Sequence, residues 1–433
     1  MPDAASTAHR PISRGSLAIA AFSTIVEWYD FTLYLYFATV LSRVFFGGGA
    51  GSLLTTLGGF AMAYLMRPLG ALFFGHIGDR QGRRHMMLLS VALMTAAMLA
   101  TALLPTFSQV GIAAGALLFL LRCVMGFSVG GEYTGVVAYL LEGAPPRRRG
   151  LVASLASASS EIGALLAVGV SALTVASMSE ADLASWGWRI PFLFGAALAG
   201  SVWIARAAME ESPEFHRQRE QGTIPLSPLR HSLANHKGAI ARAFAISALG
   251  SITYYVGITY VPAFLTSAGK LSESASLWLS TAAAVAVILV TPLVGIWSDR
   301  IGRKPVLVLL SLGNAILPAT MFALMASGSH GQALAGALVL AALAGGVSAV
   351  GAVATAEQFP GEGRVTGLAL SATMATAIFG GLTPWIAQLL IARTGWSLAP
   401  GAMIALVAVC VLPVFLTMRE TAPAPSRPTG KAA

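Results

Sequence analysis

"GHIGDRQGRR" (75–84) and "GIWSDRIGRK" (295–304) are nearly the same ten letters, and they stand 220 residues apart. Each copy is a small cluster of charge between two long apolar stretches. Five letters match: Gly75, Asp79, Gly82 and Arg83 match Gly295, Asp299, Gly302 and Arg303, and Arg80 matches Arg300. This repeat predicts a duplicated chain whose two halves have the same architecture.

The composition indicates a membrane protein. Of the 433 residues, 56% are hydrophobic and only 10% are charged, and the mean hydropathy is +0.74. Ordinary soluble domains carry about 25% charged residues. A helix that crosses ~30 Å of hydrocarbon needs roughly 20 apolar residues, so the chain has room for about twelve spans.

The apolar runs between charge clusters predict an all-α membrane protein with twelve transmembrane helices in two six-helix bundles. The first bundle occupies 1–208, a cytoplasmic linker 209–240, and the second bundle with a short cytoplasmic tail 241–433. The expected spans are 17–45, 54–77, 86–105, 111–140, 151–177, 187–208, 241–267, 276–297, 305–326, 333–356, 366–392 and 397–418.

The distribution of Lys and Arg predicts the orientation. With the N-terminus in the cytoplasm, the cytoplasmic side, with the span-end residues Arg206 and Arg242 included, collects 21 of the 27 Lys and Arg residues. The opposite loops hold only Arg43, Arg189, Lys270 and Arg393. Cationic loops stay on the cytoplasmic side, so both termini are expected there. This orientation signal explains the net charge of +9 without nucleic acid, for which the sequence shows no binding module.

The repeated loops are expected to gate the molecule. Each forms the cytoplasmic turn between the second and third span of its half, where glycine lets two helix ends approach. Asp79 and Asp299 can cap a helix N-terminus or pair with Arg83 and Arg303 across the cytoplasmic gap. The predicted gating residues are the shared glycines, Asp79, Asp299, Arg83 and Arg303, together with Arg84 and Lys304 at the ends of the motifs.

Several further stretches carry a family resemblance. They are "EWYDFTLY" (27–34), "MRPLGALFFGHIGDRQGRR" (66–84), "RCVMGFSVGGEYTG" (122–135), "WGWRIPF" (186–192) and "EESPEF" (210–215). With the repeated loops, which look like the loop motif of the major facilitator superfamily, they resemble the metabolite:proton symporter family. The resemblance implies a bacterial inner-membrane importer of organic acids or zwitterionic osmolytes, driven by protons. Parallel six-span halves with a shared midplane site are the architecture of that superfamily.

Acidic residues inside the spans are candidate proton carriers. Glu27, Asp30 and Tyr34 lie on one face of the first span. A mid-membrane carboxylate costs about 2.5–3.5 kcal/mol, so it serves a partner or a task. Asp30 is the first candidate, followed by Glu27, Glu161 and Glu132, and an ion pair with an intramembrane arginine is compatible with this role.

Two arginines, Arg67 and Arg122, fall well inside predicted spans and away from the span ends. The planar guanidinium of Arg122 suits a carboxylate, so this residue is expected to bind a substrate anion or to balance the proton-carrying acid. Arg67 precedes Pro68 and lies nearer the cytoplasmic end, which favours snorkelling or gating over substrate contact.

The second half has few deep charges, so it is expected to contribute hydrogen bonds and shape. The seventh span supplies Tyr254, Tyr255 and Thr259, and the eleventh supplies Thr376 before a Gly380-Gly381 weak point. With Arg122 and Tyr34, these residues make up the predicted substrate site. Packing roles for the aromatic and glycine positions remain an alternative.

Motifs of other chemistry are absent from the sequence. It contains no phosphate-binding Gly-Lys-Ser loop, no zinc-type Cys/His spacing and no nucleophile elbow. The chain is therefore expected to be no enzyme and to need no metal or cofactor, with the proton gradient as its energy source. Its expected partners are a small-molecule substrate, the proton and the lipid bilayer, and it is expected to function as a monomer.

Three functions stay open at this stage. The first is import of a di- or tricarboxylate such as citrate or alpha-ketoglutarate with protons by alternating access. The alternative is proton symport of a zwitterion such as proline or betaine, because "GFSVGGEYTG" (126–135) resembles that branch too. The third is a drug:proton antiporter, which the lack of proline in 150–178 disfavours.

Overall fold

The computed structural model describes residues 14–49, 51–81, 83–130, 146–207, 236–359 and 364–422. Over these ranges the regular structure is helical, and they contain no β-strand. Ten of the described helices are long and apolar enough to cross a membrane. The shorter apolar helix α6 (Ile112–Ser128) and the first helix, α1 (Arg14–Tyr36), complete the twelve expected spans.

The first half begins with α1, which continues as α2 (Ala38–Phe46) after a break at Phe37. The longer helices that follow are α3 (Ser52–Gln81), α4 (Arg83–Ala102), α6, α8 (Arg149–Ser177) and α10 (Arg189–Ala207). Short elements connect them, namely α5 (Phe107–Val110), η1 (Pro146–Arg148), α9 (Glu180–Asp182) and η2 (Leu183–Gly187).

The second half begins with α13 (Lys237–Tyr254), the π-helical segment η3 (Tyr255–Thr259) and α14 (Val261–Ser267), which together form the seventh span. The next three are single helices, α15 (Glu273–Ile301), α16 (Arg303–Met325) and α17 (His330–Ala356). The eleventh span consists of α18 (Arg364–Thr376), the π-helical η4 (Ala377–Gly381) and α19 (Leu382–Thr394), and α20 (Ala399–Thr417) is the last.

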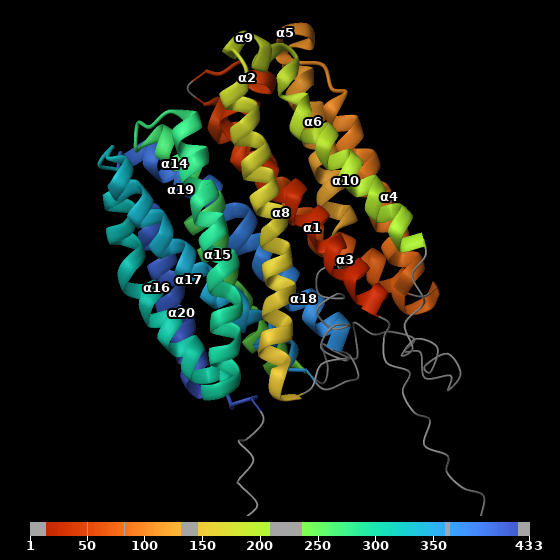
Figure 1. Cartoon of the computed structure of the whole chain (residues 1–433), viewed down its shortest axis with the longest axis vertical. Helices are drawn as coiled ribbons and strands as arrows, with labels where there is room; N and C mark the ends of the chain where they lie inside the picture. Colours follow the sequence, from red (N-terminus) through yellow and green to blue (C-terminus); the bar gives the residue numbers. More distant parts are fainter. Residues whose placement is uncertain are drawn as a thin grey trace, which may run out of the picture.

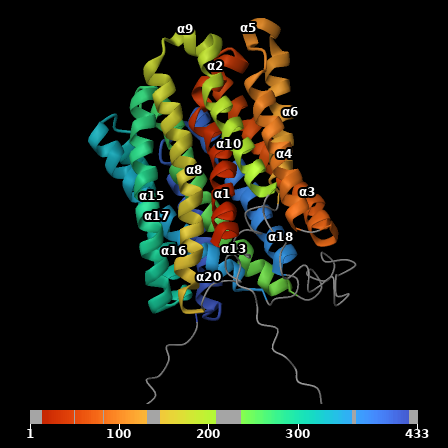
Figure 2. The same cartoon turned by 45° about the vertical axis from the view of Figure 1, so that its right-hand side comes forward.

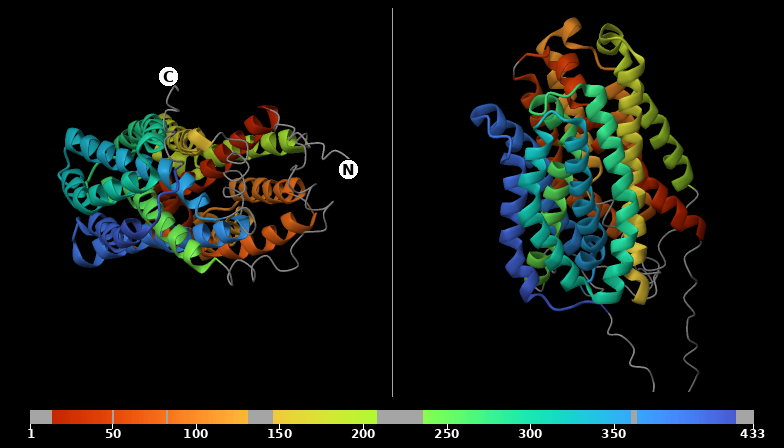
Figure 3. Two further views of the ribbon diagram at one scale, coloured as in Figure 1. Left: turned by 90° about the horizontal axis from the view of Figure 1, so that it is seen from below. Right: turned by 60° about the vertical axis from the view of Figure 1, so that its left-hand side comes forward.

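The two halves lie side by side. Helices of the first half, red to yellow-green, occupy one side of the molecule, and those of the second, green to blue, occupy the other (Figure 1). The view from below shows the same division (Figure 3). At the boundary α8 packs along α15, as two views agree (Figures 1 and 2), and α3 contacts α18, η4 and α19. The expected fold of two six-helix bundles is thereby confirmed.

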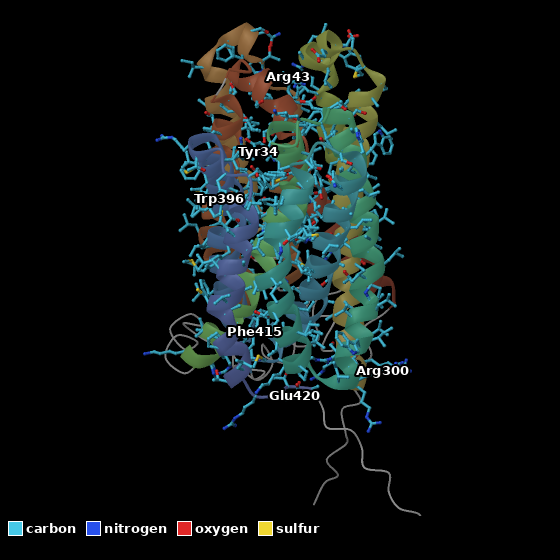
Figure 4. All side chains as sticks on the ribbon, turned by 90° about the vertical axis from the view of Figure 1, so that its left-hand side faces the viewer. Tyr34, Arg43, Arg300, Trp396, Phe415 and Glu420 are labelled. Carbon is cyan, nitrogen blue, oxygen red and sulfur yellow. The ribbon has the colours of Figure 1, made fainter. Side chains whose placement is uncertain are left out.

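The two ends of the bundle are named after labelled residues. Arg43 lies at the upper end and Glu420 at the lower end (Figure 4), and these are called the Arg43 end and the Glu420 end below. Arg300, at the end of α15, also lies at the Glu420 end. The exact domain boundaries, which fall mostly on residues outside the described ranges, stay a prediction.

Glycine sets the close packing of α3 against α6. A Cβ atom at Gly126 would collide with the backbone carbonyl of Ala63, so only glycine permits this approach. The same packing brings Arg67 of α3 and Arg122 of α6 to the side of α1 that carries Glu27 and Asp30.

Candidate functional site

A cavity of about 160 Å³ lies between the two halves. Its wall is largely apolar, with a few polar groups that converge on the space, which is the usual composition of a small-molecule site. The first half supplies Trp28, Arg67, Ser160 and Glu161. The second half supplies most of the rest, including Ser251, Tyr254, Tyr255 and Thr376.

The cavity extends from the middle of the bundle toward the Glu420 end. Its lining from α17 runs from Val347 to Thr355, which is the part of this helix next to Glu357. Glu357 accepts a hydrogen bond from Arg303 Nε at 3.4 Å, and Arg303 lies beside Glu420. The cavity therefore extends toward the end of the bundle that holds the loop between α15 and α16.

Asp30 and Arg122 form a buried ion pair. Arg122 Nη1 donates to Asp30 Oδ2 at 2.9 Å, and its Nη2 donates to Thr101 Oγ1 at 3.1 Å. Asp30 is 0% and Arg122 3% exposed, and neither is among the residues that line the cavity. The structure thus combines the predicted proton carrier with the predicted anion-binding arginine, outside the wall of the cavity.

Glu27 and Arg67 form a second ion pair, one helical turn away on α1. The two side chains approach to 3.4 Å between Arg67 Nη2 and Glu27 Oε1. The Arg67 guanidinium also lies over two aromatic rings, 3.9 Å from the centroid of Phe31 and 4.5 Å from that of Tyr64. Arg67, for which gating or snorkelling was expected, is a wall residue of the cavity.

Glu161 enters the cavity from α8. A Cβ atom at Gly163 would collide with the α1 backbone at Ile25, so this glycine lets α8 come close to α1 near Trp28. The Glu161 side chain is 3% exposed, and its Oε2 has no hydrogen-bond partner among the described residues. The hydroxyl of Tyr254, a neighbour on the cavity wall, interacts with the Glu161 carboxylate.

Two tyrosines from opposite halves meet beside the cavity, on its side toward the Arg43 end. The hydroxyls of Tyr64 in α3 and Tyr255 at the start of η3 are hydrogen-bonded to each other. Trp28 stacks on Tyr255 with ring centroids 6.3 Å apart. Added Cβ atoms at Gly380 and Gly381 would collide with Tyr255 and Tyr64, respectively. The two adjacent glycines, Gly380 and Gly381 in η4, therefore leave the space that this pair of tyrosines occupies.

The remaining predicted substrate residues have different positions. Thr376 lines the cavity, and its hydroxyl is 3.0 Å from that of Ser251. Thr259 lies outside the wall and donates to the Tyr255 carbonyl at 3.0 Å. Tyr34 also lies outside the cavity wall. Its hydroxyl donates to the Thr56 carbonyl in α3 at 2.9 Å.

The second copy of the repeated loop connects the two halves at the Glu420 end. Asp299 accepts hydrogen bonds from the backbone N–H groups of Gly150 and Leu151, both at 2.9 Å, at the start of α8. Arg303 Nη1 donates to Asp299 Oδ1 at 2.8 Å. The carboxylate thus caps a helix of the first half while an arginine of its own half holds it.

Other residues of this loop serve the same contact. A Cβ atom at Gly295 would collide with Ser154 of α8, so glycine brings the two helices together there. Gly302 has a φ of +106° and faces the Glu420 carboxylate. Glu420 accepts from the backbone N–H groups of Arg303 at 2.9 Å and Lys304 at 3.0 Å.

The first copy of the loop is described only in part. Arg84 donates to the carbonyl of Ala207 in α10. The side chains of Asp79 and Arg83, the surroundings of Gly75, and Gly82 as a whole lie outside the described part of the chain. Glu132, the remaining proton-carrier candidate, lies outside it as well. Their roles stay predictions.

The Arg43 end has its own link between the halves. The guanidinium of Arg43 in α2 forms a two-pronged ion pair with Glu273 at the start of α15, at 2.5 and 3.0 Å. Inter-half contacts through charged groups thus exist at both ends, with the cavity between them.

Comparisons with known proteins place this architecture. Residues 17–425 match the family model described as "Sugar (and other) transporter". The chain belongs to this family. It is a multi-pass membrane transporter of the major facilitator superfamily and not an enzyme. Within the described residues, no group of three His, Cys, Asp or Glu side chains is placed to hold a metal ion.

Individual members of this transporter family align over nearly the whole chain. The proline/betaine transporter of Escherichia coli K12 is 32% identical over 95% of this chain and 84% of its own length. The citrate-proton symporter of Klebsiella pneumoniae is 32% identical over 92% of this chain and 90% of its own. A structure of the xylose transporter XylE from E. coli, in a partially occluded inward open conformation, has the same fold with a TM-score of 0.75. At 22% identity it covers 95% of this chain and 99% of its own.

Some residues of this transporter's site were not selected from the sequence. Trp28 lines the cavity although attention went to its acidic neighbours, and its position between Glu27 and Asp30 was the available signal. Thr101 contacts Arg122 but stands in an ordinary apolar run. Glu357 and Glu420 bind Arg303 in the second copy of the repeated loop. The only sequence signal for a role was their position just after the tenth and twelfth spans.

Proposed function

We propose that this protein is a proton-coupled symporter that imports a small solute carrying a carboxylate group, by alternating access. The observation that carries the proposal is the separation of two arginines. Arg67 is the one cation among the described residues that line the cavity, whereas Arg122 is sealed behind the wall with Asp30. One arginine is therefore assigned to the substrate carboxylate and the other to the proton-carrying acid.

The Asp30–Arg122 pair suits coupling because its charge balance depends on one proton. When Asp30 is ionised, Arg122 has its counter-ion and its hydrogen bond to Thr101. When Asp30 takes a proton, the buried guanidinium loses that counter-ion, and the packing of α1, α4 and α6 around it must adjust. Glu27, Glu161 and Glu132 remain the other candidates for this proton.

Alternating access uses the links at the two ends. The Tyr64–Tyr255 hydrogen bond and the Arg43–Glu273 pair close the Arg43 end of the cavity. If these links break while the Asp299 contacts at the Glu420 end persist, the cavity opens toward the Arg43 end. We assign the Glu420 end and both termini to the cytoplasm of a bacterial inner membrane, the moving bodies to 1–208 and 241–433, and the functional unit to a monomer without a cofactor.

The energy source follows from this mechanism. Inward movement of one proton is worth about 2.3 kcal/mol per 100 mV, which concentrates a solute about fiftyfold. Two relatives support the two solute classes, since one is named a citrate-proton symporter and another a proline/betaine transporter. Arg67 suits both, because organic acids and amino-acid-like zwitterions share the carboxylate.

The experiment uses the purified full chain in proteoliposomes. Counterflow with radiolabelled organic acids, proline and betaine identifies the solutes that exchange, and an imposed proton gradient then tests accumulation. We expect accumulation to collapse with an uncoupler while counterflow continues. Accumulation that survives the uncoupler but stops when sodium is removed would overturn the proton assignment.

A further inference from the structure

The charges on the cavity wall are balanced. Among the described lining residues, Arg67 is the one cation and Glu161 the one anion. They come from different helices, α3 and α8, so they present their charges from different directions. An organic acid with two or three carboxylates would find one positive partner and one negative neighbour, which repels its second carboxylate.

Glu161 is a buried carboxylate whose neighbouring polar group is a neutral side chain, Tyr254, and not a cation. It is 97% buried, and no ion pair to it occurs among the described residues. Its Oε2 accepts no hydrogen bond within that part of the chain. A buried carboxylate without a charged partner is costly, so its retention on a binding-cavity wall points to a cation that comes with the ligand.

The aromatic groups near Glu161 suit such a cation. Trp28 and Tyr254 line the cavity with it and meet edge to face, with ring centroids 5.1 Å apart. A ring face attracts an ammonium group through its quadrupole, and more strongly when water is excluded. The buried Tyr254 hydroxyl interacts with the Glu161 carboxylate, so it can orient that carboxylate toward a bound cation or turn to a substrate N–H group.

We propose that Glu161, Trp28 and Tyr254 form a subsite for the positively charged nitrogen of the substrate. This inference rests on the proposed function, in which Arg67 takes the carboxylate. The two subsites together select a small zwitterion with an ammonium group and a carboxylate, and they disfavour di- and tricarboxylates. Glu161 thereby acts as a specificity determinant and not as the proton carrier.

The test compares solutes that differ only in the charge on the nitrogen position. Glycine betaine is paired with 3,3-dimethylbutanoate, and proline with cyclopentanecarboxylate, in which carbon replaces the charged nitrogen. Each solute competes with counterflow in proteoliposomes that contain the full chain. We expect the wild-type protein to favour at least one zwitterion over its carbon analogue by about tenfold or more, since hydrogen bonds and pairs to buried charges are worth about 1.5–3 kcal/mol.

Variants then locate the preference. Glu161→Gln should lower this ratio toward one while binding of the carbon analogue persists, which also reports that the protein is folded. Trp28→Leu should lower the ratio for betaine, and Tyr254→Phe should reduce it less. Tyr260→Phe is the matched control, because Tyr260 is buried and bonds Gln388 at 2.6 Å away from the cavity wall.

The outcomes separate this inference from the proposed function. A wild-type protein that exchanges organic acids but ignores both zwitterions overturns the subsite and leaves the symport proposal standing. An unchanged ratio in Glu161→Gln overturns the subsite as well, and loss of accumulation with intact exchange in that variant reassigns Glu161 to the proton. If no carboxylate-bearing solute exchanges at all, the proposed function itself fails.

Discussion

The two halves of the molecule repeat the same architecture but divide the chemistry between them. The offset of 220 residues that relates the two loops also pairs Glu27 with Ser247 and Asp30 with Gly250. At these positions α1 carries two buried acids, each paired with an arginine. In α13 the corresponding residues are a serine and a glycine, and both Ser247 and Gly250 line the cavity. One half therefore holds the charge, and the other leaves room for a substrate.

The same contrast holds for the backbone. α8, the fifth span of the first half, is a continuous helix from Arg149 to Ser177, whereas the corresponding eleventh span is interrupted by η4. The seventh span is interrupted by η3, which contacts η4 beside the cavity. π-helical turns inside α-helices often occur at functional sites. We infer that the buried acids of the first half couple proton movement to transport. The seventh and eleventh spans of the second half bend at their π-helical segments.

The largest expected effect concerns Arg122. Arg122→Lys keeps the charge but cannot reach both Asp30 and Thr101 with a fixed fork, so transport should fall by about ten- to a hundredfold. Initial uptake rates, normalised to the amount of folded protein in the membrane, measure this. Near-normal uptake by the lysine variant would mean that charge alone suffices, and the coupling role of the geometry would be lost.

The next prediction separates two activities at Asp30. Asp30→Asn imitates the protonated acid permanently, so proton-driven accumulation should disappear while counterflow of the same solute remains measurable. Glu27→Gln, in the neighbouring ion pair one turn away on α1, tests the next candidate in the same way, and we expect it to keep proton-driven accumulation. If counterflow and folding are both lost in Asp30→Asn, Asp30 is a structural ion-pair member, and normal accumulation would remove it from the mechanism.

Much of the fold was predictable because it depends on composition and repetition. Apolar runs that are long enough to cross a membrane define the spans. The repeated loop motif then shows that these spans form two equivalent halves. The π-helical break in the seventh span was not predictable, because it depends on how Tyr255 packs against Gly380 in a span more than a hundred residues away. No local sequence pattern reports such a contact.

The site was predictable by residue type and less by position. Charged residues inside spans stand out, so Asp30, Arg122 and Glu161 were selected. Their direction was not predictable, because the rotation of each helix about its axis decides whether a side chain faces the cavity or a neighbouring helix. Arg122 faces α1 and α4, whereas Arg67 reaches the cavity wall.

A smaller effect is expected at Thr101. Thr101→Val keeps the shape but leaves a buried Arg122 N–H group without its acceptor, which costs about 1–3 kcal/mol and should slow uptake severalfold. Thr101→Ser keeps the hydroxyl and should restore uptake. Thr95→Val is the matched control on α4. Thr101 donates to the carbonyl four residues before it, that of Ala97, and Thr95 donates in the same way to that of Val91 but makes no hydrogen bond with Arg122. Equal losses in both valine variants would reduce Thr101 to a helix-packing residue.

The smallest expected effect lies at the Glu420 end, where the second half binds its own tail. Partial burial alone would raise the pKa of Glu420, but four backbone N–H donors, from Ala422, Arg303, Lys304 and Thr421, outweigh it and hold that pKa below its usual value. The folded state therefore favours the ionised form. This contribution is complete above the unfolded pKa of about 4.3 and disappears as the pH falls through the lower folded pKa.

Glu420→Gln should accordingly lower the thermal stability in detergent slightly at neutral pH, by less than about 1 kcal/mol for so exposed a group. The difference from the wild type should shrink as the pH falls below about 4. Glu180→Gln makes the same charge change at α9, near the Arg43 end, and controls for net charge (Figure 1). A difference that persists unchanged at low pH would show that the carboxylate charge does not hold the start of α16, and that the side chain acts there by packing alone.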